Sequence, residues 1–561
     1  MMTPGLARGR ATKRRLMAMC MALALAAAAC GGDDDDLSTP DDSEVTGTDP
    51  GTDTTEPETT DTPDTTGGGD GEPVRGGTLT IGVTAETDRF DPGNGNIAFP
   101  ARAVHHLVYG SLTATTRDGE WVPYLAESVE SNADATVWTV TLRPGLVFHD
   151  GNPLDAEAVK ASIDRYRFES INKAAVEYIA DTVVVDELTI EITLNKSFGV
   201  FPQALADEIG AIVSIAATEE WGDAYGDHPT GAGPYKVVEY VRDDHLTLER
   251  VDDFFMDTRG WADTIIFRPI PDDAARSAAL RAGDLDIIET WNPVEIASFR
   301  GDDNFQLHEE ANGAQGLLFS VAHIPDLRVR QAVAMAVDRE QLIDLVWNGV
   351  GEPVTTPFPE DSVWHAGDVV YPEYDPAAAQ ALIEEVEAEG EPVAFRILSA
   401  TDDTATNYKL AVAEQLRAVG IDVEIQTASD VNDYVNLYIT GEYDLFTAGV
   451  FALVDPWFEY TRRYSSTSIL NGTGFEDPAL DEALLAAEAS TDPAVRKENY
   501  DLVQKLLADN MVQMFVTTNT AAIITSNDIE GYGTLVGPDG EPTLGNFPLF
   551  LRADEFWRND S

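Results

Sequence analysis

The feature that most constrains the fold is the length of the stretch from residue 76 to residue 561, which contains no low-complexity linker. A single hydrophobic core rarely grows past about 250–300 residues, so a stretch of this length is expected to form two or more lobes. Without a linker between them, the lobes should pack together and be joined by more than one crossing of the chain.

The segment before this body is too polar to fold. Residues 31–72 consist almost entirely of Asp, Glu, Thr, Gly, Pro and Ser, with 15 acidic residues and no Lys or Arg. Such a composition cannot form a core, and its like charges extend the chain. The Asp run at residues 33–36 could bind a metal ion, but the composition of the whole segment favours a solvated tether over residues 30–75.

The first 29 residues have the pattern of an export signal peptide. A basic segment without acidic residues precedes an apolar run over residues 16–29, which is the order found in signal peptides. The run is shorter than the roughly 20 apolar residues that a transmembrane helix needs. The pair Arg14-Arg15 leaves both general secretion and the twin-arginine route open.

The end of this segment contains a candidate lipid-attachment site. The run Ala-Ala-Ala-Cys at residues 27–30 resembles the bacterial lipobox, in which the cysteine becomes the lipidated first residue. The other cysteine, Cys20, lies inside the apolar run and would be lost with it, so Cys30 would be the sole thiol of the exported protein. One anchor would hold the protein at the outer face of the cytoplasmic membrane. A plain cleavage site followed by a chance cysteine is the alternative.

The charge excludes some partners. The formal net charge is -63, so nucleic acid and anionic membrane surfaces are poor partners. We interpret the acidity as that of a surface suited to high salt, with a cationic ligand as the alternative.

Strand and helix patterns alternate along the body and predict a mixed α/β protein. Alternation with period two predicts strands or hairpins at residues 77–83, 136–142, 182–194 and 236–250. Helical periodicity, with Asp or Pro at the start and Gly at several ends, predicts helices at residues 272–282, 328–347, from 376 on, 408–419 and 496–509.

An ordered set of short motifs covers nearly everything after residue 75. The motifs are residues 76–82, 91–92, 109–112, 123–128, 126–148, 149–159, 231–235, 328–339, 374–376 and the helix that contains Arg496. In this order they resemble the extracellular solute-binding protein family 5, which comprises the dipeptide, oligopeptide and nickel binding proteins of ABC importers.

The resemblance implies the two-lobe clamshell of type II periplasmic binding proteins, with a subdomain inserted in the first lobe. Lobe I would comprise residues 76–98, 226–312 and 515–561, the inserted subdomain residues 99–225, and lobe II residues 313–514. The chain would cross between the lobes near residues 309–319 and 511–518. The two crossings would act as a hinge, so that closure traps a ligand between the lobes.

The resemblance also implies candidate ligand contacts in lobe II. Residues 447–457 match the cleft loop of the family, and Asp455 matches an aspartate that pairs with the α-amino group of a peptide, through a charge-assisted hydrogen bond. A turn or helix-capping role beside Pro456 is the alternative for Asp455. Gly449, Phe451 and Trp457 belong to the same loop, where the aromatic rings would line side-chain pockets or belong to the core.

Other candidate contacts come from elsewhere in the chain. By resemblance, Trp291 and Tyr109 lie near the cleft, and Thr401 lies in a loop where some relatives bind the carboxylate of a peptide. Those relatives often have Arg in this loop, whereas residues 400–403 here are Ala-Thr-Asp-Asp. This departure leaves a neutral or cationic ligand open.

The predicted function is the capture of a small ligand, with a peptide favoured, for delivery to an ABC permease dimer with cytoplasmic ATPases. The chain has no P-loop, no Gly-x-Ser-x-Gly motif and no helical zinc motif, so we expect no enzymatic activity, metal site or cofactor. A monomer is the habit of the family. The alternatives are a sensory binding protein with the same clamshell and a non-peptide ligand such as a nickel complex, a sugar or an opine.

Overall fold

The computed structural model describes residues 72–86, 90–93, 99–116, 120–169, 176–358, 360, 362–390, 392–400, 403–429, 431–450, 455–538, 540 and 551–559. A ten-stranded sheet runs through both lobes in the order β14-β13-β15-β12-β16-β11-β1-β10-β9-β8. In chain order its strands are β1 (Thr78–Val83), β8 (Tyr235–Val241), β9 (His245–Arg250), β10 (Thr264–Pro269), β11 (Ile287–Thr290), β12 (Phe305–Phe319), β13 (Ala394–Leu398), β14 (Asp422–Gln426), β15 (Leu445–Val450) and β16 (Gln513–Ser526).

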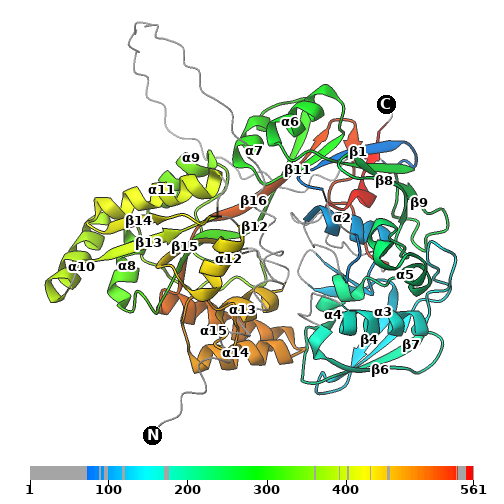
Figure 1. Ribbon diagram of the computed structural model, residues 1–561, viewed down its shortest axis with the longest axis horizontal. Coiled ribbons are helices and arrows are strands. Elements are labelled where there is room, and N and C mark those ends of the chain that lie inside the picture. The colour runs from blue at the N-terminus through cyan, green and yellow to red at the C-terminus, as the bar shows by residue number, and fades with distance from the viewer. Residues whose placement is uncertain are drawn as a thin grey trace, which may run out of the picture.

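Lobe I is built on the half of the sheet that runs from β16 to β8. Helices α6 (Asp273–Ala282) and α7 (Pro293–Phe299) cover one face, where they pack on Ile288 and Ile524. Helix α2 (Phe99–Val108) lies on the other face, in a core that includes Ile287 and Ile523 (Figure 1). Residues 551–558 return to this lobe with the short strand β18 (Trp557–Arg558), which pairs with β17 (Ile529–Glu530).

The inserted subdomain is a four-stranded antiparallel sheet with helices. The strand order is β4-β5-β7-β6. Its elements are β4 (Ala126–Ser131), β5 (Val137–Leu142), β6 (Ile179–Val184), β7 (Thr189–Leu194), α3 (Ala156–Glu169), α4 (Phe201–Ala204) and α5 (Ile215–Trp221), with the small hairpin of β2 (Thr113–Thr115) and β3 (Trp121–Pro123) beside them. Its core is continuous with that of lobe I, so the two pack as one body, and the boundaries expected from the resemblance stay a prediction.

Lobe II is built on the half of the sheet that ends at β14. The two faces carry separate apolar clusters, one around Leu317 and Ile397, the other around Leu318 and Leu398. Its helices are α8 (Leu327–Ala336), α9 (Arg339–Trp347), α10 (Pro376–Glu389), α11 (Asp403–Ala418), α12 (Val431–Thr440), α13 (Trp457–Tyr464), α14 (Pro478–Ala489) and α15 (Pro493–Asp509). Within the described ranges, no helix is both long and apolar enough to cross a bilayer.

Strands β12 and β16 carry the chain from one lobe to the other. They run antiparallel along almost their whole length, and the register shifts between Ala311 and Ala314 and again between Gln315 and Gly316. At the first irregularity Gly313 has φ of +83°, a conformation that favours glycine because it has no Cβ. The irregularity divides the pair into a lobe I half and a lobe II half, which is where a hinge is expected.

Several predicted helix ends are confirmed at atomic detail. Asp272 caps α6 by accepting the N–H of Ala275, and Gly283 ends the helix in the left-handed conformation. Asp375 caps α10, whose first residue is Pro376. These local signals act within one turn of helix, so they do not depend on the rest of the fold.

The single helix predicted over residues 328–347 is wrong. The structure has two helices there, because Val337 is extended and Asp338 caps α9 by accepting the N–H of Gln341 at 2.9 Å. The apolar pattern continues across the break, so periodicity alone did not reveal it, although the Asp at position 338 was a visible capping signal.

Candidate functional site

The candidate site begins where two parallel strands of lobe I end beside the hinge strands. Strand β1 pairs in parallel with β11 through Ile81 and Ile287, and β11 also pairs with β16. In open α/β sheets, ligands bind outside the carboxyl ends of the strands. The segment that follows β11, which includes Trp291, therefore lies where a ligand contact is expected.

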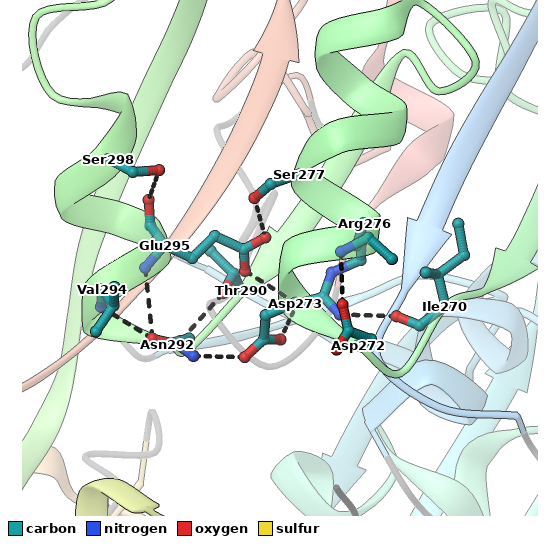
Figure 2. Close-up of polar contacts among 11 residues, drawn as sticks. Ile270, Asp272, Asp273, Arg276, Ser277, Thr290, Asn292, Val294, Glu295 and Ser298 are labelled. Atoms are coloured by element: carbon teal, nitrogen blue, oxygen red, sulfur yellow. Dashed lines mark hydrogen bonds and ion pairs between the residues drawn. The ribbon is translucent and has the colours of Figure 1, made fainter. Parts of the chain in front are cut away.

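A set of hydrogen bonds holds the backbone on both sides of Trp291 (Figure 2). The backbone N–H of Asn292 donates to Thr290 Oγ1 at 3.0 Å. Asn292 Oδ1 in turn accepts the N–H of Val294 at 2.9 Å and so caps α7, while Asn292 Nδ2 donates to Asp273 on α6. The half-buried Trp291 is therefore presented by a fixed turn.

A buried ion pair between α6 and α7 stabilises this turn. Arg276 is fully buried; its Nη2 donates to Glu295 Oε2 at 3.0 Å and its Nη1 donates to the carbonyl oxygen of Ile270 at 2.8 Å (Figure 2). Burial raises the pKa of Glu295, and the charge of Arg276 together with the hydroxyl of Ser277 opposes this rise. Since a buried charge is costly without its partner, the pair ties α6 firmly to α7.

Glu289 is a functional candidate that sequence analysis missed. It lies on β11 two residues before Trp291 and is 7% exposed. Among the described residues its Oε1 has no hydrogen-bond partner. Burial raises the pKa of Glu289 to about 7, against the lowering effects of a hydrogen bond from Trp291 and the charge of Arg276. A carboxyl group in the strand IIET carries no sequence signal, because its burial follows from the sheet.

Asp455 is engaged inside lobe II. Its Oδ2 forms a buried ion pair with Arg496 of α15, and its Oδ1 accepts the backbone N–H of Trp457 at 2.9 Å. The hydroxyl of Tyr500 lies 3.5 Å from Oδ1. These contacts favour the structural alternative, in which Asp455 shapes the turn that enters α13; pairing with a ligand stays a prediction.

Gly449 lies in β15 against the hinge. A Cβ atom at this position would approach Nε2 of Gln315 to 3.0 Å, and the carbonyl oxygen of Gly449 accepts Nη2 of Arg463 at 3.0 Å. The amide of Gln315 donates to Oδ1 of Asn519 at 3.1 Å and so links β12 to β16. These two amides are polar groups at the hinge that sequence analysis did not single out.

Tyr109 and Trp457, two of the predicted aromatic contacts, differ in their surroundings. Tyr109 is fully buried, and its hydroxyl donates to the carbonyl oxygen of Phe90 at 2.9 Å, which favours a role in the core of lobe I. Trp457 is half-buried and packs on Phe198 and Tyr178 of the inserted subdomain. Its ring therefore bridges the two lobes.

The remaining predicted residues, Phe451, Thr401 and the lipid-attachment candidate Cys30, lie outside the described residues. Within the part of the chain that the structure describes, no group of three or more His, Cys, Asp or Glu side chains could hold a metal ion. The candidate residues that the structure describes are polar or aromatic, which suits hydrogen bonding and stacking.

The first prediction concerns Asp455. Asp455→Asn removes the charge that Arg496 faces, and we expect a loss of roughly 3 kcal/mol in the free energy of unfolding of the ligand-free protein, since breaking a buried pair leaves an unpaired charge. Asp509→Asn is the matched control, because its pair with Lys505 on α15 is exposed and is worth at most about 1 kcal/mol. Denaturant unfolding measures both. Unchanged stability of Asp455→Asn together with weaker ligand binding would instead assign Asp455 to the ligand.

The second prediction concerns the pH dependence of Glu289. Its pKa is raised to about 7 in the folded protein, so the native state prefers the neutral acid. Ionisation of Glu289 therefore destabilises the folded protein. This destabilisation is absent below the pKa that Glu289 has in the unfolded chain, and it grows as the pH rises to about 7. We expect Glu289→Gln to match the wild type near pH 4 and to be more stable by roughly 3 kcal/mol at pH 8. Unfolding curves at several pH values test this, with the exposed Glu220→Gln as control; a difference that does not vary with pH contradicts it.

Comparison with known proteins places this geometry in a family. Residues 120–471 match the family described as bacterial extracellular solute-binding proteins, family 5 Middle. The glutathione-binding protein GsiB of Pectobacterium atrosepticum is 27% identical over 483 residues, which cover 82% of this chain and 91% of that protein.

Solved structures agree with the fold. One is the binding protein AgaA from A. tumefaciens R10, in complex with agropinic acid, which is 25% identical to this chain and has a TM-score of 0.70. The alignment covers 86% of this chain and 99% of AgaA. The substrate-binding protein CtaP of Listeria monocytogenes has a TM-score of 0.74 at 22% identity, with 87% of this chain and 100% of that chain covered. The two-lobe α/β fold predicted from the motifs is confirmed, and the chain belongs to the bacterial extracellular solute-binding proteins of family 5.

Proposed function

We propose that this protein is the extracytoplasmic substrate-binding component of an ABC importer and that its ligand is a small peptide. The observation that carries the proposal is the arrangement of two lobes on one sheet, joined by β12 and β16 with a register shift between them. Such a hinge allows one lobe to close on the other around a ligand. ATP hydrolysis then belongs to the partner proteins, a permease dimer and its ATPases.

The relatives support a peptide as the ligand class. Glutathione, which the similar GsiB proteins are named for binding, is a tripeptide. The structural neighbour DppA of Helicobacter pylori was solved with the peptide STSA. Agropinic acid in AgaA and a nickel–histidine complex in NikZ of Campylobacter jejuni are the competing ligand chemistries.

In this proposal both lobes and the hinge supply contacts. From lobe I, Trp291 offers an aromatic face and Glu289 Oε1 accepts a hydrogen bond from an N–H group of the peptide. Gln315 and Asn519 offer amide groups at the hinge. The end of β15, at Gly449, contributes from lobe II. Closure removes these groups from water, which strengthens each polar contact.

The N-terminal segment gives the proposed protein its location. We propose that residues 1–29 direct export, that Cys30 is lipidated, and that the acidic tether lets a monomeric body reach the permease from the outer face of the membrane. The 15 acidic residues of this segment carry the charge that an anionic lipid surface repels, in keeping with this location.

The third prediction identifies the ligand. We expect native mass spectrometry of the protein, purified at molar salt and transferred to ammonium acetate, to show bound mass, and denaturing release to yield short peptides. Glu289→Gln should then weaken rebinding of the recovered peptide by roughly tenfold, which corresponds to about 1.4 kcal/mol. The exposed Glu220→Gln should leave binding unchanged. Recovery of a single opine, sugar or metal complex would contradict the peptide assignment.

The fourth prediction tests the anchor. In a bacterial host with lipoprotein processing, the wild-type chain should fractionate with membranes and Cys30→Ser should appear in the soluble exported fraction, because a protein without its acyl chains loses the apolar area that holds it in the bilayer. Labelling with a radioactive fatty acid checks the modification directly, and Cys20→Ser serves as the control. Membrane association of Cys30→Ser equal to that of the wild type would refute lipidation at this residue.

A further inference from the structure

Two regions far apart in sequence meet at a distance from the hinge strands. One is the segment that follows β7 in the inserted subdomain, and the other is formed by α13 and α14 of lobe II. In Figure 1 these helices lie beside α4 of the subdomain near the bottom of the view, whereas β12 and β16 cross between the lobes higher up. The lobes therefore touch at a second place besides the hinge.

The apolar part of this contact is formed by three aromatic rings. The ring of Trp457, at the start of α13, lies edge-to-face with Phe198 at a centroid distance of 4.8 Å and with Tyr178 at 6.3 Å. Phe198 is fully buried. Edge-to-face aromatic pairs add to the stabilisation that apolar burial provides, so separating the lobes here has a free-energy cost.

The polar part is an ion pair between a buried acid and a partly exposed lysine. Lys196 Nζ of the subdomain pairs with Glu488 Oε1 of α14, and the same ammonium group lies 4.0 Å above the centre of the Tyr178 ring. Glu488 is 2% exposed; burial raises its pKa and Lys196 opposes that rise. Because the partner of this acid comes from the other lobe, opening the contact removes the charge that balances it.

The two backbones also touch directly. The N–H of Gly199 donates to the carbonyl oxygen of Glu488 at 2.8 Å. A Cβ atom on Gly199 would lie 2.1 Å from the carbonyl oxygen of Ser490 and 2.7 Å from the backbone nitrogen of Thr491. Any side chain at position 199 would therefore force the lobes apart, and the nearest atoms that it would meet all belong to lobe II.

We propose that Lys196, Phe198 and Gly199 form with Trp457 and Glu488 an interlobe clasp that closes the protein before a ligand binds. Every contact in the clasp joins protein to protein, so its formation needs no ligand atom. Together with the hinge it bounds the region between the lobes on two sides, and a ligand enters when the clasp opens. The clasp thus sets the balance between closed and open forms of the ligand-free protein.

The proposal has a consequence for binding kinetics. If the ligand-free protein is mostly closed, only the open fraction accepts a ligand, and the observed association rate falls with that fraction. Loosening the clasp then speeds both entry and release. This consequence holds for any ligand class, so the clasp does not depend on the peptide assignment.

The fifth prediction tests the clasp without a ligand. Spin labels are placed at Val185→Cys on the subdomain and Leu502→Cys on α15, both exposed positions, in a full chain whose own cysteines are replaced by serine. Bound ligand is removed by unfolding and refolding, and native mass spectrometry verifies its loss. Pulsed electron–electron double resonance should then show one short distance population for the otherwise unchanged chain, and Gly199→Ala should move it to longer distances by roughly 5 Å or more, as expected for domain opening.

Matched variants distinguish loss of the clasp from a general destabilisation of the fold. Gly390→Ala adds the same methyl group where a Cβ atom meets nothing within 4 Å, so the distances should stay short. Trp457→Ala removes the ring without adding a wedge and should also shift the population to longer distances. Identical distributions for the unchanged chain and Gly199→Ala, or a mostly open unchanged chain, would overturn the proposal, whether or not a peptide proves to be the ligand.

Discussion

The pairing of β12 with β16 is the interaction on which the rest of the structure depends. These two strands belong to both lobes, and the other strands of the main sheet add outward from them on either side. Their register shift near Gly313 interrupts the ladder at the junction of the lobes. Continuous hydrogen bonds would stiffen the whole sheet, and we infer that this local interruption allows the two halves to rotate while the strands stay paired.

Buried charged groups hold the turns of the candidate site in place. The pairs Arg276–Glu295 and Asp455–Arg496 each balance a charge inside one lobe, so they hold the turns before α7 and α13 in place. Glu289 is buried on β11, and within the described residues its Oε1 has no hydrogen-bond partner, as is also true of Nε of Arg276. A polar atom that is buried without a partner costs free energy, which an incoming donor can recover.

The hinge and the clasp have opposite effects on the separation of the two lobes. The hinge allows the lobes to separate, and the contacts of Trp457 and Glu488 with the inserted subdomain hold them together. A binding protein whose clasp is too weak would leave its ligand exposed to water, and one whose clasp is too strong would admit ligand slowly. The glycine at position 199, which lets two backbones meet, is where this balance is most easily changed by a single methyl group.

The sequence by itself determined the family, the two-lobe α/β architecture and most helix ends, because motifs, periodicity and capping residues act over a few neighbouring positions. It also pointed to Trp291 and to the loop around Asp455. The tertiary structure alone decided what these residues meet. Asp455 faces Arg496, Trp457 packs against Phe198, and Glu289 is buried with one oxygen atom that has no hydrogen-bond partner among the described residues. The physical reason is that partners, burial and the resulting shifts in pKa arise from segments brought together only when the sheet and both lobes assemble.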